Sequence, residues 1–203
     1  MSREILSTAR PTKLRFAGFL CLAVGAVAAG YGATADWVII GFPADIERVV
    51  DVTVRGTDVW EGKAVFLGAV AALLAMLAMR LSRSDAVGWS LAVALVILGL
   101  AGFALPVADA VRAEERFGGG EGVDLLAERL AAQLELPEDV VREQLREEFQ
   151  RALRVEVDQG IWISAAGGVL LATGGGLSFA WVRRRSEGRL RQSAGVGPEP
   201  ERP

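Results

Sequence analysis

Four long apolar stretches dominate the chain. They contain no Asp, Glu, Lys or Arg and cover residues 16–35, 64–79, 86–108 and 161–182. A helix rises about 1.5 Å per residue, so about 20 apolar residues cross the roughly 30 Å hydrocarbon core of a bilayer. We therefore predict a transmembrane helix on each stretch. The second is the shortest; it is extended by one residue to Arg80, whose long side chain, like that of Lys63, can reach the interface.

The loop after the first predicted helix, residues 36–63, carries a strand pattern. Segment 49–55 alternates apolar and polar side chains and is rich in valine, which is typical of a strand. Together with the apolar run 37–42 and a turn at Pro43, this predicts a small β-hairpin. The alternative is that residues 37–40 continue the first helix until Pro43 ends it.

The link between the second and third predicted helices is only residues 81–85. So short a link forces the two helices into an antiparallel hairpin.

Residues 109–160 form a long acidic segment with a helical pattern. Apolar residues recur at every fourth position, and Pro137, which is favoured in the first turn of a helix, divides them into two amphipathic helices. Their apolar stripe has to be buried against the neighbouring helix, the headgroup layer or a partner protein. We assign it to partner binding, with the residues Leu126, Leu130, Val141, Leu145, Phe149 and Leu153.

Two further segments are predicted to lack fixed structure. Residues 116–122 are rich in glycine and predict a flexible tether. The C-terminal tail, residues 183–203, begins with arginines and continues from Ser186 with few residues to bury, so disorder is expected.

These elements together predict an all-α integral membrane protein. Its fold class is a four-helix transmembrane bundle with an extracytoplasmic α-helical segment and, in the hairpin interpretation, a small β-hairpin in the first outer loop.

Charge predicts the orientation of this bundle. Basic residues concentrate in residues 1–15, 80–85 and 183–203, whereas the segment 109–160 is acidic. By the positive-inside rule, both termini are cytoplasmic and the acidic segment is outside. The tryptophans agree, because such amphipathic rings prefer interfaces. Trp37, Trp60 and Trp162 fall at the predicted outer interface, and Trp89 and Trp181 at the inner one.

The amino-acid composition indicates where in the cell the protein is located. Hydrophobic residues make up 52% of the 203 residues, and the mean hydropathy is +0.35, which is too apolar for an average soluble domain. Arginine-rich, lysine-poor usage is typical of GC-rich bacterial genomes. We therefore expect a multi-pass protein of the plasma (inner) membrane.

The N-terminus also allows a second interpretation. A basic start, an apolar run and the tripeptide Ala26-Val27-Ala28 are features of a cleavable secretory signal. The apolar run continues to Ala33, which is longer than the usual signal and favours an uncleaved helix. Cleavage would leave three spans in the same orientation.

Small residues recur at every fourth position in the first and last predicted spans. Such stripes let helix backbones approach closely in lipid. The expected helix-packing residues are Ala17, Gly25, Ala29, Ser164, Gly168, Ala172 and Gly176. The two stripes either pack on each other, which we favour, or one of them packs on a partner. The triplet 174–176 is interpreted as close packing, with a kink or broken helix as the alternative.

What the sequence lacks limits its chemistry. The four stretches have no charged residue, the chain has no His, and Cys21 is the single cysteine. Proton relays, general bases and multi-cysteine metal sites depend on such residues. Glu143 and Glu147, four residues apart, are interpreted as a solvated helix face rather than a cation site. We expect no catalytic residue, no cofactor, no metal and no nucleic acid.

In outline the chain resembles the tetraspan plan of claudin-like proteins, with both ends inside, a short inner loop and two outer loops. The Gly-Leu-Trp stretch and paired loop cysteines of claudins are absent, so the resemblance implies the plan alone. The functional hypothesis is a non-catalytic accessory, assembly or envelope-organising component. It would bind a membrane or extracytoplasmic protein through the outer helical segment. The alternative is a small channel or transporter built as a homo-oligomer.

Overall fold

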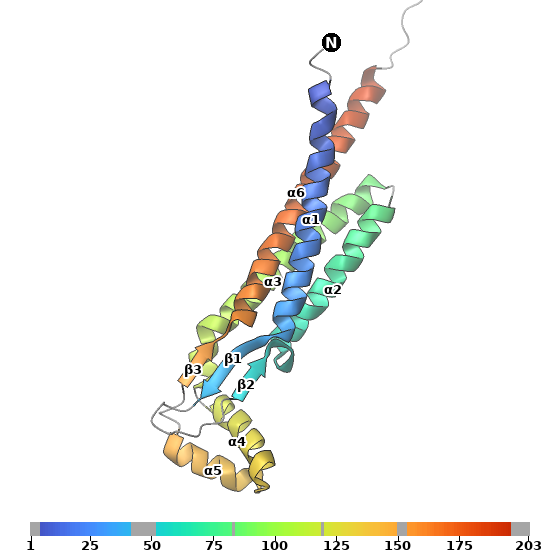
Figure 1. The fold of residues 1–203 in the computed structure, drawn as a ribbon. Coiled ribbons are helices and arrows are strands. Elements are labelled where there is room, and N and C mark those ends of the chain that lie inside the picture. Colours follow the sequence, from blue (N-terminus) through green and yellow to red (C-terminus); the bar gives the residue numbers. More distant parts are fainter. Residues whose placement is uncertain (1–4, 42–51, 83, 119, 150–153, 196–203) are drawn as a thin grey trace, which may run out of the picture.

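The computed structural model describes residues 5–41, 52–82, 84–118, 120–149 and 154–195. Helices account for most of these residues (Figure 1). In chain order the elements are α1 (Ile5–Thr34), β1 (Asp36–Gly41), β2 (Val52–Arg55), a short 3-10 helix (Gly56–Asp58), α2 (Trp60–Leu81), α3 (Asp85–Phe117), α4 (Gly120–Leu134), α5 (Glu138–Phe149), β3 (Arg154–Val157) and α6 (Gln159–Gly195).

Four of these helices are long and apolar enough to cross a membrane, which confirms that part of the prediction. The candidate spans are Lys13–Thr34, Trp60–Leu81, Asp85–Phe117 and Gln159–Gly188. All four of these helices are longer than predicted, since α1 begins at Ile5 and α2 at Trp60. α3 continues through Pro106 to Phe117, and α6 continues to Gly195 through the segment expected to be disordered. An ion pair between Arg183 and Glu187 at i,i+4, with 3.0 Å between Nε and Oε1, supports this helical extension.

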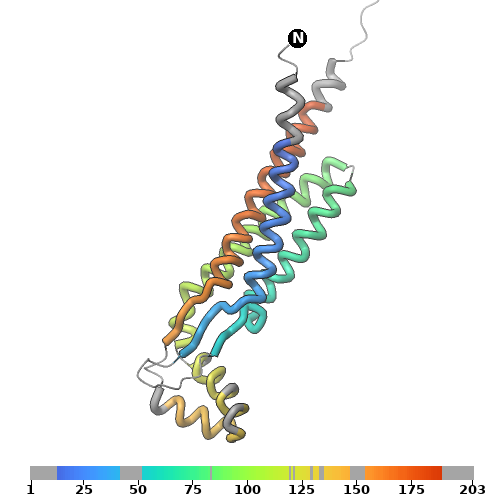
Figure 2. The backbone as a smooth tube through the Cα atoms, viewed as in Figure 1, coloured from blue at the N-terminus to red at the C-terminus, as the bar shows by residue number. Residues whose placement is uncertain are grey.

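α6 is the central helix of the bundle. It packs against α1 on one face and α3 on another, more extensively than any other pair of elements, and α2 lies between α1 and α3. α1 and α6 run side by side for most of their length (Figure 2). The start of α1, the end of α6 and the connection between α2 and α3 lie toward one end of the bundle, and the strands with α4 and α5 lie at the other (Figure 1).

A three-stranded antiparallel sheet, in the order β2-β1-β3, closes the second end of the bundle. Pairing of Val38 with Val54 and of Ile40 with Val52 confirms the predicted antiparallel strands. The alternative, in which residues 37–40 continue the first helix, is wrong. The predicted turn at Pro43 lies outside the described residues.

The third strand, β3, was not predicted. Residues 154–157 fall in the segment 109–160, for which the sequence predicts helices, but α5 ends at Phe149. Val155 pairs with Ile40, and Val157 pairs with Val38. β-branched side chains of this kind pack well on the pleated surface of a sheet, and pairing with β1 outweighs the helical spacing.

Trp37 fixes the corner where α1 becomes β1. Its side chain is buried, and its indole Nε1–H donates a hydrogen bond of 2.8 Å to the carbonyl oxygen of Gly32. Its own carbonyl accepts a 2.8 Å hydrogen bond from the N–H of Asp158, just before α6. The prediction that Trp37 sits at a lipid interface is therefore wrong, whereas Trp60 and Trp162 are exposed.

The glycine-rich segment is also more ordered than predicted. α3 reaches Phe117 and α4 begins at Gly120, so residues 116–122 are largely helical. Phe117 is buried, and the N–H of Gly118 bonds to the carbonyl of Glu114 at 2.9 Å. Burial of this aromatic anchors the end of α3 despite the neighbouring glycines.

Candidate functional site

The α1–α6 interface is a contact between backbones. A Cβ added at Gly167 of α6 would meet the amide nitrogen of Ala29 and lie 2.8 Å from its Cα. A Cβ added at Gly25 of α1 would lie 2.7 Å from the amide nitrogen of Leu171. Real Cβ atoms essentially never come within 3.0 Å of other heavy atoms. The two helices therefore approach as closely as glycine allows, which maximises dispersion contact in lipid.

A second face of α6 packs in the same way on α3. A Cβ at Gly168 would lie 2.5 Å from the carbonyl carbon of Gly102 and 2.8 Å from the carbonyl oxygen of Gly99. At the far end of this interface the rings of Trp89 and Phe179 are 4.0 Å apart between centroids. α6 is thus held between α1 and α3 through two separate strips of small residues.

The predicted helix-packing residues divide among these faces. Gly25, Ala29 and Ser164 lie in the α1–α6 interface, and Gly168 and Ala172 lie against α3. Ala17 is exposed, and a Cβ at Gly176 meets nothing within 4 Å.

Helix geometry explains this division. At 3.6 residues per turn, each step of four residues overshoots a full turn by about 40°, so a long i+4 series winds around the helix. The strip of α6 that faces α1 alternates steps of four and three, which average 3.5 and stay on one side. This strip consists of Gly160, Ser164, Gly167, Leu171, Gly174 and Ser178.

The stripe assigned to partner binding lies largely inside the α4–α5 helical hairpin. Leu126, Val141 and Leu145 are buried in the core, and Leu130 packs partly buried against it. Phe149 is the last residue of α5 and its side chain is not described; Leu153 lies outside the described residues. The described part of the stripe is therefore buried within the protein, where α4 contacts α5 and, less extensively, α3 and β2.

Ion pairs also hold α4 to α5. Oδ1 of Asp124 in α4 lies 3.1 Å from Nε of Arg142 and 3.4 Å from an Nη of Arg146, both on α5. These side chains are partly exposed, so each pair contributes little free energy on its own. They do fix which faces of the two helices meet.

A buried ionic cluster joins α2 to α3 near the sheet. One Nη of Arg116 lies 3.2 Å from Oε1 of Glu61 and 3.2 Å from Oδ1 of Asp109. The side chains are 27%, 14% and 10% exposed, respectively, so water screens them weakly. Oε2 of Glu61 is buried without a hydrogen-bond partner among the described residues.

Sequence reasoning missed this cluster. Asp109 and Arg116 are separated by two helical turns on α3 and so share a face, but Glu61 is remote in sequence. That spacing of seven residues was the only local signal. The cluster acts as a structural clasp, because one guanidinium bridges a carboxylate of α2 and a carboxylate of α3.

Within the part of the chain that the structure describes, no group of three or more His, Cys, Asp or Glu side chains is placed to hold a metal ion. Comparisons of the chain with protein-family models and with curated proteins found no match. The α4–α5 hairpin projects beyond the sheet (Figure 1) and is the candidate functional site, because it exposes the apolar side chains of Leu136 and Val140.

Proposed function

We propose that the chain is a non-catalytic four-span protein of the plasma (inner) membrane, with both termini in the cytoplasm. It acts as an accessory, assembly or envelope-organising component and binds a protein partner through the α4–α5 hairpin outside. The observation that carries this proposal is an exposed apolar pair, Leu136 and Val140, at the tip of that hairpin.

The distribution of charge supports the orientation. Arg15, Arg80 and Arg185 line one pocket. The end of α6 that carries the arginines 183–185 lies at the same end of the bundle as the start of α1 and the end of α2 (Figure 1). The opposite end carries the acidic residues of α4 and α5. Basic residues remain preferentially on the cytoplasmic side, so this distribution supports an outer position for the hairpin.

Single-cysteine labelling tests this orientation. In a Cys21→Ser background, cysteines are introduced at Ser84, Asp139 or Glu187, all of which are exposed. A membrane-impermeant maleimide should label intact cells at position 139 alone, and all three positions after permeabilisation. Labelling of intact cells at position 84 or 187 would invert the orientation.

Packing of α1 supports its retention as a span rather than its removal as a signal. Leu22, Ala26 and Ala29 are almost completely buried. Cleavage after Ala28 would remove Gly18, Leu22 and Gly25, which are most of the α1 positions against which α6 packs. A full-length mass for the mature protein would agree with retention.

The proposed contact surface is the tip of the hairpin rather than its inner stripe. Leu136 and Val140 are 47% and 44% exposed, whereas Leu126 and Leu145 are used within the hairpin. Exposed neighbours of the pair are acidic and include Glu135, Glu138, Asp139 and Glu143. The surface therefore suits a partner with a small apolar pocket bordered by basic residues.

Site-specific photo-crosslinking in cells tests the contact. A photoreactive residue at position 140 should form an adduct with one defined protein, and Leu136→Ser should reduce the yield. The same photoreactive residue at Glu128, which is exposed on α4, serves as the control and should give no such adduct.

Photo-crosslinking with the Leu136→Ser variant also separates partner binding from the alternative function, an oligomeric channel or transporter. Leu136→Ser replaces an exposed side chain, so it should change the free energy of unfolding by less than about 0.5 kcal/mol. Adducts formed only with a second copy of the chain, together with ion or solute flux into liposomes containing the purified protein, would reject partner binding and favour an oligomeric channel.

A further inference from the structure

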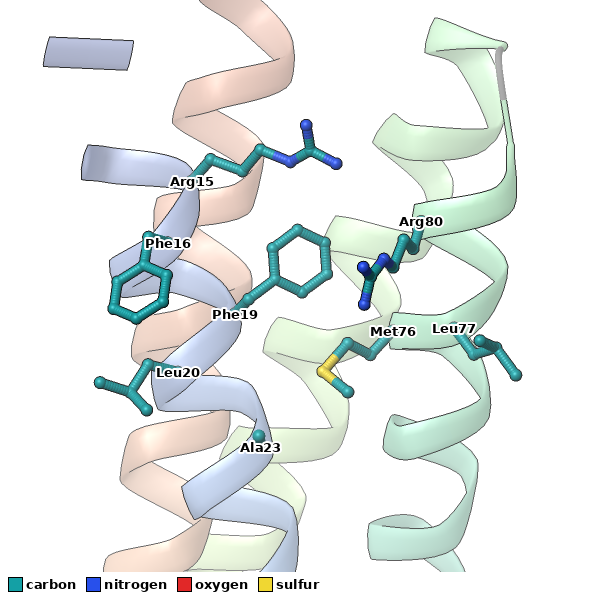
Figure 3. A pocket seen from close by; sticks show the side chains of 8 residues that line it. All are labelled: Arg15, Phe16, Phe19, Leu20, Ala23, Met76, Leu77 and Arg80. Atoms are coloured by element: carbon teal, nitrogen blue, oxygen red, sulfur yellow. The ribbon is translucent and has the colours of Figure 1, made fainter. Parts of the chain in front are cut away.

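An apolar groove separates α1 from α2 near the end that carries the chain ends. It encloses about 570 Å³, and its apolar wall includes Phe19 and Ala23 of α1 and Met76 of α2. Arg15 and Arg80 reach over its mouth from the two facing helices, with Phe19 and Met76 directed into the gap below them (Figure 3).

A small polar pocket of about 60 Å³ adjoins this groove and shares both arginines with it. Arg185 of α6 and Asp85 of α3 also line the pocket, and they face each other at 4.0 Å between Nε and Oδ1. The serines 82 and 84 add hydroxyl groups. Three guanidinium groups thus surround a pocket that has one carboxylate, which leaves an excess of positive charge.

Neither Arg15 nor Arg80 is neutralised inside the described structure. The guanidinium of Arg15 lies over the rings of Trp181 and Phe19, at 5.1 and 5.7 Å from their centroids, and neither arginine has a carboxylate at ion-pair distance among the described residues. Cation–π contacts orient a guanidinium while its N–H groups stay available to an anion.

This arrangement matches the two parts of an anionic lipid. Guanidinium groups bind a phosphate through paired, charge-assisted hydrogen bonds. The apolar groove starts directly beneath them (Figure 3), so the acyl chain of a lipid whose phosphate they held would lie along it, and its volume of about 570 Å³ falls in the range of small-molecule sites. A free phosphate would use the arginines but leave the groove unexplained.

We propose that the groove between α1 and α2 binds an anionic phospholipid, with the headgroup phosphate between Arg15 and Arg80 and one acyl chain along Phe19, Ala23 and Met76. The lipid joins two helices that otherwise diverge at this end. The site does not depend on the protein-partner proposal, since it lies at the opposite end of the bundle.

A titration of the full-length protein in neutral detergent tests this site. Phosphatidylglycerol should raise the thermal midpoint, and phosphatidylcholine should not. Arg15→Gln together with Arg80→Gln should weaken the apparent affinity for phosphatidylglycerol about tenfold or more, because both phosphate contacts are lost. The matched control is Lys13→Gln with Arg184→Gln, which removes two exposed charges at the same end but lines neither pocket and should retain binding.

A second variant tests the groove without any change of charge. Ala23→Phe should fill the acyl-chain channel and abolish stabilisation by phosphatidylglycerol, which keeps the test decisive if the double arginine variant is unstable. Equal losses in the arginine variant and its control would mean generic surface attraction and would reject the site. Inorganic phosphate that raised the midpoint as much as phosphatidylglycerol would also reject it, in favour of a free-anion site.

Discussion

Substitution of Gly167 by alanine should separate α1 from α6. The added Cβ would lie 2.8 Å from Cα of Ala29, whereas ordinary van der Waals contact begins at 3.4 Å, so the helices have to move apart by about 0.6 Å or more. Gaps of 0.5–1 Å forfeit about a quarter to a half of each contact's dispersion energy. Overpacking of this kind typically costs about 1–3 kcal/mol.

Gly176→Ala is the matched control, because it makes the same chemical change on the same helix where a Cβ meets nothing within 4 Å. It should leave stability unchanged or raise it by up to about 1 kcal/mol through helix propensity. For a chain of this length, about 2 kcal/mol lost at Gly167 corresponds to a fall of roughly 4–8 °C in the thermal midpoint. Tryptophan fluorescence during heating in detergent measures both variants.

Equal effects of the two substitutions would refute the reasoning. If Gly176→Ala lowered the midpoint as much as Gly167→Ala, the packing strip would follow the i+4 series and not the alternating series of the structure. If both variants were as stable as the parent, close approach of α1 and α6 would not matter for stability.

Two further predictions concern the outer end of the bundle. Arg116→Met should destabilise the protein by about 1–3 kcal/mol, which is less than for a fully buried ion pair because Arg116 is partly exposed. Adding Glu61→Gln and Asp109→Asn should recover part of this loss in the free energy of unfolding. No recovery would mean that the carboxylates do not depend on Arg116. Glu135 follows the end of α4 with a φ of 54°, a left-handed conformation that favours glycine, so Glu135→Gly should increase hydrogen-exchange protection at the end of α4. The same substitution at Glu128, which is exposed in the middle of α4, should decrease protection. Changes of the same sign at both positions would contradict this interpretation.

The four long helices could be predicted from the sequence, but the helix faces that pack together could not. Long uncharged stretches specify helices because, in lipid, a helix satisfies the backbone hydrogen bonds of a single segment internally. Which small residues meet is harder, because α6 carries glycines at 167, 168, 174, 175 and 176. Several strips fit such a run, and only the partner helices select among them.

At β3, the helical pattern of the preceding residues suggested one structure and pairing with a distant strand produced another. Residues 154–157 alternate charged and apolar side chains, a strand signal, but they follow a helical series that suggested continuation. Pairing partners for this strand lie in β1, more than a hundred residues earlier in the chain. Separation along the sequence also hides the clasp of Glu61 with Arg116, which are 55 residues apart, and the convergence of Arg15 with Arg80.

The four long helices differ in how much of their surface is buried by the rest of the protein, and α2 is the least buried. In its most apolar window 22% of α2 is buried, compared with 44% for α6, so α2 has the least protein around it among the candidate spans. Glu61 ties one end of α2 to Arg116 of α3. Near its other end, Arg80 faces the groove rather than a carboxylate. The proposed lipid site therefore lies beside the candidate span that has the least protein around it, and loss of lipid should loosen α2 while leaving the glycine-packed α1–α6–α3 core intact.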